Sequence, residues 1–339
     1  MTIPHRFGES APFSVGVEEE LMIVDGESLR LVPRVAGLIA EADGLPLKTE
    51  LFASVVETTT GVHETAAAAA GEAASLRRQA AAVATRLGLR IMAGGSHPIS
   101  LPEEQKIVPE ERYRSFVEYA GVSAQFQGVN GLHVHIGMPD PESCYRALEG
   151  VLPWLPVVLA LSANSPYFAG RETGLLSSRA PVLAQLPRAG APPAFGSYAA
   201  WEAWVERLRR LGVAADHTRI WWDLRPAPQF GTLEIRIPDQ PTAVERTAAL
   251  VELVVALCRR ALDRDLRVAD RGDYLHNRWA AMRFGPAAEL IHPDGDRIVL
   301  AAELAADLGP CEAERQLEVG RASGLDGVCA DLVERSLPS

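Results

Sequence analysis

The stretch NGLHVHIGM, residues 130–138, carries the pattern from which the rest of the chain is interpreted. Successive side chains of a β-strand point to opposite faces, so Val134 and Ile136 would lie on an apolar face. His133 and His135 would share the other face, where the glycines on either side leave room above the backbone. Two imidazoles on one sheet face suit a metal ion or an anionic group. A half-buried strand that carries two histidines without any ligand has the same pattern.

A second predicted strand, residues 13–24, places two carboxylates on one face. Glu18 and Glu20 repel each other there unless a cation lies between them. Glu19 is the exception on the opposite, apolar face. An acidic edge strand exposed to water would show the same spacing.

Further segments carry polar groups of the same kinds. Residues 48–62 are rich in β-branched side chains, and Glu50 and Glu57 share a face there only where a bulge or turn intervenes. Residues 219–226 and 231–238 predict a β-hairpin. If all these strands belong to one sheet, their polar side chains would line one concave surface, and their apolar side chains would pack on helices. The polar pairs are Glu18 and Glu20, Glu50 and Glu57, His133 and His135, Asp223 and Arg225, and Glu234 and Arg236.

These residue types point to phosphoryl transfer. Carboxylates with one or two imidazoles suit Mg²⁺ or Mn²⁺ better than Zn²⁺, which prefers His and Cys. Arginines beside such ions suit phosphate, because the guanidinium fork matches its oxygens and stays charged. The chain has only two lysines, neither of which follows a glycine-rich loop, and no G-x-G-x-x-G opens a helix. If ATP binds, it therefore binds on a sheet and not in a P-loop.

Composition narrows the class of protein. The 339 residues are 47% hydrophobic, with a net charge of −11, as in an ordinary folded, soluble protein. No basic patch with interleaved aromatic residues is present, which argues against nucleic-acid binding. The four cysteines lack paired or metal-type spacing and are interpreted as free thiols in a reducing compartment. Residues 1–12 lack the apolar segment of a secretory signal, and the most apolar run, 151–163, is too short to span a bilayer, so we expect a cytoplasmic protein.

The remaining segments are mostly predicted helices. Residues 168–196 are rich in Gly, Pro and Arg, as in lids, binding loops or disordered segments, and most of their arginines are interpreted as solvated. Thr242 and Glu245 predict a capping box. No internal repeat or clear linker is seen, so residues 1–339 are expected to form a single domain. The predicted helices span residues 33–42, 64–87, 110–120, 142–163, 197–211, 242–262, 272–284 and 296–339.

At this point the chain resembles the carboxylate–amine ligase family related to type-2 bacterial glutamate–cysteine ligase, within the glutamine-synthetase-like superfamily. The matching pieces follow one another over most of the chain. They are GVEEE (16–20), Glu50 with VET (56–58), SHP (96–98), GLHVHIG (131–137), WWDLRP (221–226), TLEIR (232–236) and NRW (277–279). The sequence departs from many relatives at His276, where an acidic residue is more usual, and at Ser96, where Thr is commoner.

The resemblance implies an α+β fold, in which a mainly antiparallel, curved sheet carries helices on its convex face. It implies ATP and two or three Mg²⁺ ions, with Mn²⁺ as an alternative metal. The reaction would phosphorylate a carboxylate, usually the γ-carboxylate of glutamate, and an amine such as cysteine would then attack to give an amide. The resemblance also suggests a homodimer, with no nucleic-acid or membrane partner.

The positions of the candidate site residues within the family's motifs imply their roles. The resemblance implies that Arg225 and Arg236 stabilise the transferring phosphoryl group and that His135 touches phosphate. Arg112 and Arg179 are candidates for holding substrate carboxylates. The implied metal ligands are Glu18, Glu20, Glu50, Glu57, His133 and Glu234.

Two other enzyme classes fit part of the pattern. A metal-dependent amidohydrolase also carries His-x-His at a strand end, but it would need a βα-repeating barrel with this pair near the N-terminus. A guanidino kinase uses similar glutamate and arginine chemistry on a related sheet, and its product would be a phosphorylated guanidine without an amide.

Overall fold

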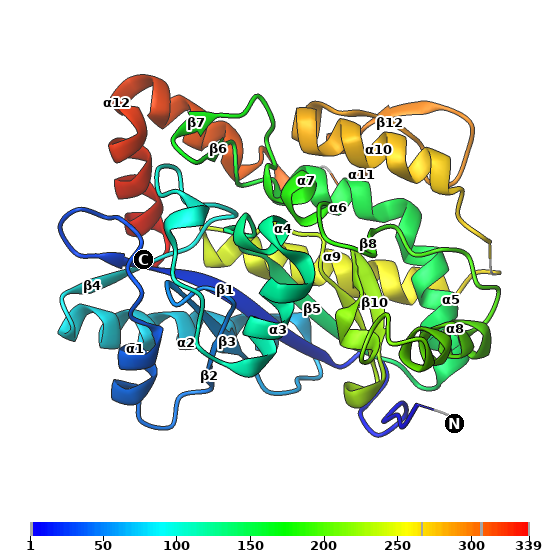
Figure 1. Cartoon of the computed structure of the whole chain (residues 1–339). Helices are drawn as coiled ribbons and strands as arrows, with labels where there is room; N and C mark the ends of the chain where they lie inside the picture. The colour runs from blue at the N-terminus through cyan, green and yellow to red at the C-terminus, as the bar shows by residue number, and fades with distance from the viewer. Residues whose placement is uncertain (1–2, 266, 306–307, 338–339) are drawn as a thin grey trace.

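A seven-stranded sheet organises the computed structural model, which describes residues 3–265, 267–305 and 308–337. The strand order is β10-β11-β5-β1-β3-β2, and β4 also pairs with β1, the long strand at the centre of Figure 1. Each of these neighbouring pairs is antiparallel. The strands are β1 (Val15–Asp25), β2 (Leu47–Thr49), β3 (Val55–Thr59), β4 (Leu89–Met92), β5 (Leu132–Gly137), β10 (Leu224–Ala227) and β11 (Thr232–Ile235).

The apolar face of this sheet packs against helices, as the alternating sequence pattern predicts. Val17, Val134 and Leu233, from three adjacent strands, are buried in one hydrophobic cluster with residues of the helices behind them. Burying such alternating apolar side chains is the main force that holds the sheet to its helices. The helices of this layer are α2 (Ala66–Arg86), α5 (Pro141–Val151), α6 (Leu155–Ser162) and α9 (Val244–Leu262).

The opposite face of the sheet is polar and is covered only in part. Residues of α3 (Glu111–Ala120) and of α7 (Arg179–Leu183) line a cleft there together with polar side chains of the strands. Figure 1 shows α3 and α4 (Val122–Gln125) in front of β1 and β5, with α2 and α9 behind. The observed architecture confirms the predicted α+β fold, with an open antiparallel sheet.

Smaller elements complete the described chain. One continuous helical segment, Pro141–Ser162, is long and apolar enough to cross a membrane, but 78% of its most apolar window is buried inside the protein, as in a core helix. The other helices are α1 (Val35–Glu41), α8 (Tyr198–Arg210), α10 (Arg271–Phe284), α11 (Ala301–Leu304) and α12 (Glu312–Arg335). The other strands are β6 (Tyr167–Phe168), β7 (Arg171–Glu172), β8 (Ala189–Gly190), β9 (Trp221–Trp222), β12 (Glu289–Ile291) and β13 (Ile298–Leu300).

Three local expectations are wrong. Residues 298–300 of the predicted helical tail form β13, which pairs with β12; residues 306–307 and 338–339 of that tail lie outside the described residues. The capping box at Thr242 does not form, because the Glu312 carboxylate accepts hydrogen bonds from the backbone N–H groups of Thr242 and Ala243 at 2.7 and 2.9 Å. Residues 168–196 contain short strands and α7, whose first residue, Arg179, is buried and not solvated.

Candidate active site

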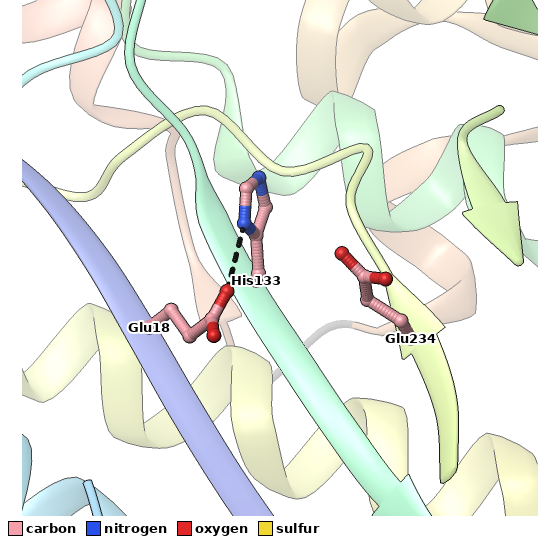
Figure 2. Close-up of side chains that lie close together, drawn as sticks. All are labelled: Glu18, His133 and Glu234. Atoms are coloured by element: carbon pink, nitrogen blue, oxygen red, sulfur yellow. Dashed lines mark hydrogen bonds and ion pairs between the residues drawn. The ribbon is translucent and has the colours of Figure 1, made fainter. Parts of the chain in front are cut away.

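Strand register brings the predicted carboxylate and imidazole groups together. Glu18 on β1 lies opposite His133 on β5, and His133 Nδ1 is 3.3 Å from Glu18 Oε2. Figure 2 shows Glu234 on the far side of His133, with its carboxylate turned toward the same space. Potential ligand atoms of Glu18, His133 and Glu234 all lie within 4.8 Å of one another. One imidazole and two carboxylates at this spacing suit a divalent cation that prefers oxygen ligands.

The hydrogen bonding of His133 also fits a bound ion. Its Nε2 atom is buried and has no hydrogen-bond partner among the described residues. A buried polar atom without a partner costs about 1–3 kcal/mol, so such an atom in a cleft points to a ligand. The pKa of His133 is lowered, first by burial and then by the charge of Arg236, which favours the neutral imidazole that metal ions need.

The carboxylates of the site repel one another. Glu20 lies opposite Glu57 in the β1–β3 register, and the turn between β2 and β3 brings Glu50 to the same group. Burial, with the charges of Glu57 and Glu20, raises the pKa of Glu50 well above its usual value. Burial, with the charge of Glu18, raises the pKa of Glu57 to about 7. A bound cation would offset this repulsion, so the donor set fits Mg²⁺ or Mn²⁺.

Two arginines hold the Glu234 side chain in place. Arg225, opposite Glu234 in the β10–β11 register, donates from Nε to Glu234 Oε2 at 2.6 Å, and Arg236 forms a second ion pair with the other oxygen. Burial alone would raise the pKa of Glu234, but the two guanidinium groups outweigh it and lower the pKa. The site therefore carries fixed positive charge at one end and crowded carboxylates at the other.

His135 lies between these two ends. Its Nδ1 atom is 2.9 Å from Thr232 Oγ1, and its Nε2 atom is 3.8 Å from Glu18 Oε2. Burial would lower the pKa of His135, but the Glu18 carboxylate and the charge of Glu234 outweigh it and raise the pKa.

The two predicted substrate arginines differ in environment. Arg179 is buried and donates to the carbonyl oxygens of Ile237 and Arg236 at 3.0 and 2.9 Å. Its guanidinium lies over Gly131, where any Cβ would overlap it. Arg112 has a half-exposed side chain that bonds Glu110 at 2.8 Å.

One cleft of about 540 Å³ contains the whole candidate site. Every residue predicted from the sequence as catalytic, metal-binding or substrate-binding lines it. These are Glu18, Glu20, Glu50, Glu57, Arg112, His133, His135, Arg179, Arg225, Glu234 and Arg236.

Asp223 does not join them. The sequence predicts Asp223 on the same strand face as Arg225, but the strand breaks between β9 and β10, so side chains do not alternate regularly there. Asp223 is instead buried and accepts hydrogen bonds from Arg278 Nε at 2.7 Å and from the Tyr274 hydroxyl at 2.5 Å. It is a structural anchor for α10.

Two aromatic side chains and one lysine near the cleft are not among the residues predicted from the sequence. Phe116 and Trp221, whose rings are 5.2 Å apart, form part of an aromatic wall. Lys48 lies 3.2 Å from Glu57. No local motif marks Phe116, and Trp221 stands in the quoted WWDLRP piece without a role assigned to it. Lys48 could have been noticed as one of only two lysines, placed in the predicted strand segment that carries Glu50 and Glu57.

The fold and the site define a class: an open antiparallel sheet whose polar face carries carboxylates, imidazoles and arginines, as expected for the ligase family that the sequence resembles. Residues 14–333 match the family model described as glutamate–cysteine ligase family 2. A relative from Rubrobacter xylanophilus, provisionally named glutamate–cysteine ligase 2-3, is 39% identical over 335 residues, which cover 98% of this chain and 91% of the relative. A relative from Herpetosiphon aurantiacus with a similar provisional name is 36% identical over 88% of this chain and 79% of its own.

Solved structures agree on the fold. The glutamate–cysteine ligase of Francisella tularensis, in complex with AMP, superposes with a TM-score of 0.70 at 14% identity, over 96% of this chain and 89% of that one. A bifunctional glutathione synthetase from Pasteurella multocida gives a TM-score of 0.63 at 13% identity, over 96% of this chain and 51% of that one. The chain belongs to glutamate–cysteine ligase family 2, and it is an ATP-dependent ligase. The antiparallel sheet excludes the βα-repeating barrel of the amidohydrolase alternative.

Proposed function

We propose that the protein is a Mg²⁺-dependent carboxylate–amine ligase that activates the γ-carboxylate of glutamate as an acyl phosphate. A carboxylate oxygen of the substrate attacks the γ-phosphorus of ATP, and ADP leaves. The nitrogen of an amine such as cysteine then attacks the acyl carbon, an amide bond forms, and phosphate leaves as the nitrogen loses its proton. The observation that carries this proposal is the convergence of Glu18, His133 and Glu234 beside two buried arginines.

The proposed ligands of two or three Mg²⁺ ions are the acidic residues and the histidine that share the polar face. When bound there, divalent ions would neutralise the negative charge of the phosphates. The pairing of His133 with Glu18 supports this role because it orients the imidazole toward the group. The proposed ligand set is Glu18, Glu20, Glu50, Glu57, His133 and Glu234.

The arginines and His135 have roles that follow from their charge. Arg225 and Arg236 stay protonated and are held in place by Glu234, so their remaining N–H groups can donate to a phosphoryl group without rearrangement. His135 can donate to a phosphate oxygen from the same face. We propose that Arg179, which is held rigidly, and Arg112, at the more exposed rim, bind substrate carboxylates.

The first test is a screen of amino acids and amines for ATP-dependent phosphate release, with products identified by mass spectrometry. We expect phosphate release to require Mg²⁺, a carboxylate such as glutamate, and an amine such as cysteine together. Amide hydrolysis without ATP, or a stable phosphorylated guanidino product, would contradict the proposal.

The second test is Glu234→Gln. We expect turnover to fall by at least about 100-fold, because charge complementarity at the phosphoryl site is lost. Glu206→Gln, which alters a partly exposed carboxylate 2.7 Å from Arg209, is the matched control and should leave turnover unchanged. Near-normal turnover in Glu234→Gln would remove Glu234 from the site.

We further propose that residues 1–339 form one catalytic domain and that the enzyme works in the cytoplasm, as a homodimer.

A further inference from the structure

Lys48 is a cation that the polar face already contains. It lies on β2, directly opposite Glu57 on β3, and directly opposite residues of neighbouring strands project from the same face. Its Nζ atom is 3.2 Å from Glu57 Oε1 and 3.9 Å from Glu18 Oε1. The ammonium group therefore contacts two carboxylates that come from two different strands.

This position is where a metal ion would otherwise bridge two carboxylates. Glu57 lies opposite Glu20, and Glu18 is two residues along β1, so the acidic end of the site is a compact group of negative charges. A Mg²⁺ ion binds carboxylate oxygens at about 2.0–2.1 Å. An ion shared by Glu18 and Glu57 would therefore lie within a few ångströms of the Lys48 ammonium, where the two positive charges repel strongly.

The other proposed metal ligands still have space to bind divalent ions. The Glu18, His133 and Glu234 group lies on the side of Glu18 that faces β5 and β11, away from β2. Glu20 and Glu50, whose charges interact, remain available for a second ion.

We infer that Lys48 replaces one divalent cation, so that the site binds two divalent ions and not three. This inference rests on the metal site proposed above and decides between the two ion counts that the family resemblance left open. Lys48 is a positioning residue here: it holds the Glu57 carboxylate and offsets its charge, without a role in bond making.

The experiment counts bound Mn²⁺ by equilibrium dialysis of the purified full chain, with free Mn²⁺ measured by electron paramagnetic resonance. The variants are Lys48→Met, which removes the charge, and Lys48→Arg, which keeps it. Lys106→Met is the matched control, because Lys106 is the other lysine and its side chain is exposed. Lys48→Gln replaces Lys48→Met if the latter does not fold, as judged by circular dichroism.

We expect Lys48→Met to bind an additional Mn²⁺ per chain, with Lys48→Arg and Lys106→Met retaining the wild-type count. The affinity at the acidic end should rise by roughly tenfold or more when the competing charge is removed. An unchanged count and affinity in Lys48→Met would overturn the inference while leaving the metal site in place. Weaker Mn²⁺ binding in Lys48→Met would also overturn it. No Mn²⁺ binding by the wild-type chain would contradict the metal site itself, which is a distinguishable result.

Discussion

Glu18 and His133 occupy directly opposite positions on β1 and β5, with 3.3 Å between Glu18 Oε2 and His133 Nδ1. Because side chains alternate along a strand, a one-residue slip in this register would move the polar groups of one of the two strands to the helix side. The adjacent cross-strand pair, Val17 and Val134, is buried on the opposite face and sets the register. The hydrophobic core and the candidate metal site therefore depend on the same strand alignment.

Substitution of Glu18 should remove most of the stabilisation that Mg²⁺ gives to the folded chain. A ligand that binds only the folded state stabilises it by mass action, so Mg²⁺ should raise the Tm of the wild-type chain. Glu18→Gln should lower Mg²⁺ affinity by at least about 100-fold and remove most of this shift. Thermal scans with and without MgCl₂ measure the effect, with Glu206→Gln as a control. An equal shift in Glu18→Gln and wild type would exclude Glu18 as a ligand.

Gly131→Ala should disturb substrate binding through Arg179. The added Cβ overlaps the guanidinium of Arg179, which would have to leave its carbonyl partners on Arg236 and Ile237. We expect kcat/KM for the carboxylate substrate to fall by roughly 100-fold, since small displacements of positioning groups are costly.

Gly37→Ala is the control for that substitution, because nothing lies within 4 Å of the Cβ position at Gly37 in α1. It should keep full activity and gain about 0.5–1 kcal/mol of stability. Normal kinetics in Gly131→Ala would show that Arg179 does not act in the cleft.

Glu19, the one carboxylate on the apolar face of β1, should contribute to the stability of the fold. It points to the helix side, where Arg77 on α2 forms a buried ion pair with it, and Gln240 and Thr247 each donate to it at 3.0 Å. Arg77→Met leaves this buried carboxylate without its cation and should cost about 3–5 kcal/mol of unfolding free energy, measured by urea denaturation.

Glu206→Gln, at the partly exposed pair with Arg209, should lower the unfolding free energy far less than Arg77→Met in the same assay. A comparable small loss in Arg77→Met would mean that water reaches the Glu19 carboxylate.

His97 should make stability depend on pH. Its Nδ1 accepts hydrogen bonds from the backbone N–H groups of Ile99 and Ser100 at 3.1 and 2.9 Å, and its Nε2 donates to Leu29 O at 2.9 Å. This arrangement requires the neutral ring, and burial lowers the pKa of His97 to about 4 from 6.5. Above pH 6.5 the neutral ring contributes its full stability. The unfolded chain binds the extra proton first as the pH falls, so this contribution is lost between pH 6.5 and pH 4.

The test compares urea unfolding of wild type and His97→Gln across that range. The stability advantage of the wild type should shrink by about 3 kcal/mol from pH 7 to pH 4. A constant difference between the two proteins would mean that His97 titrates normally. The same contacts make His97 a structural residue of the segment that follows β4.

Much of the site was predictable because strands impose a period of two. That rule placed Glu18 with Glu20 and His133 with His135 on shared strand faces. Glu50 and Glu57 were expected to share a face only across a bulge or turn, and the turn between β2 and β3 provides it. The same rule failed for Asp223, because the strand is interrupted beside it.

Within one strand, the sequence alone determined which side chains share a face, because backbone geometry forces the alternation whatever the neighbours are. Only the tertiary structure decided which partners those side chains meet. Arg179 became buried over Gly131, Glu312 capped a helix about 70 residues away, and Lys48 joined the carboxylates. Such contacts depend on packing between distant segments, where burial strengthens charge interactions that no local pattern encodes.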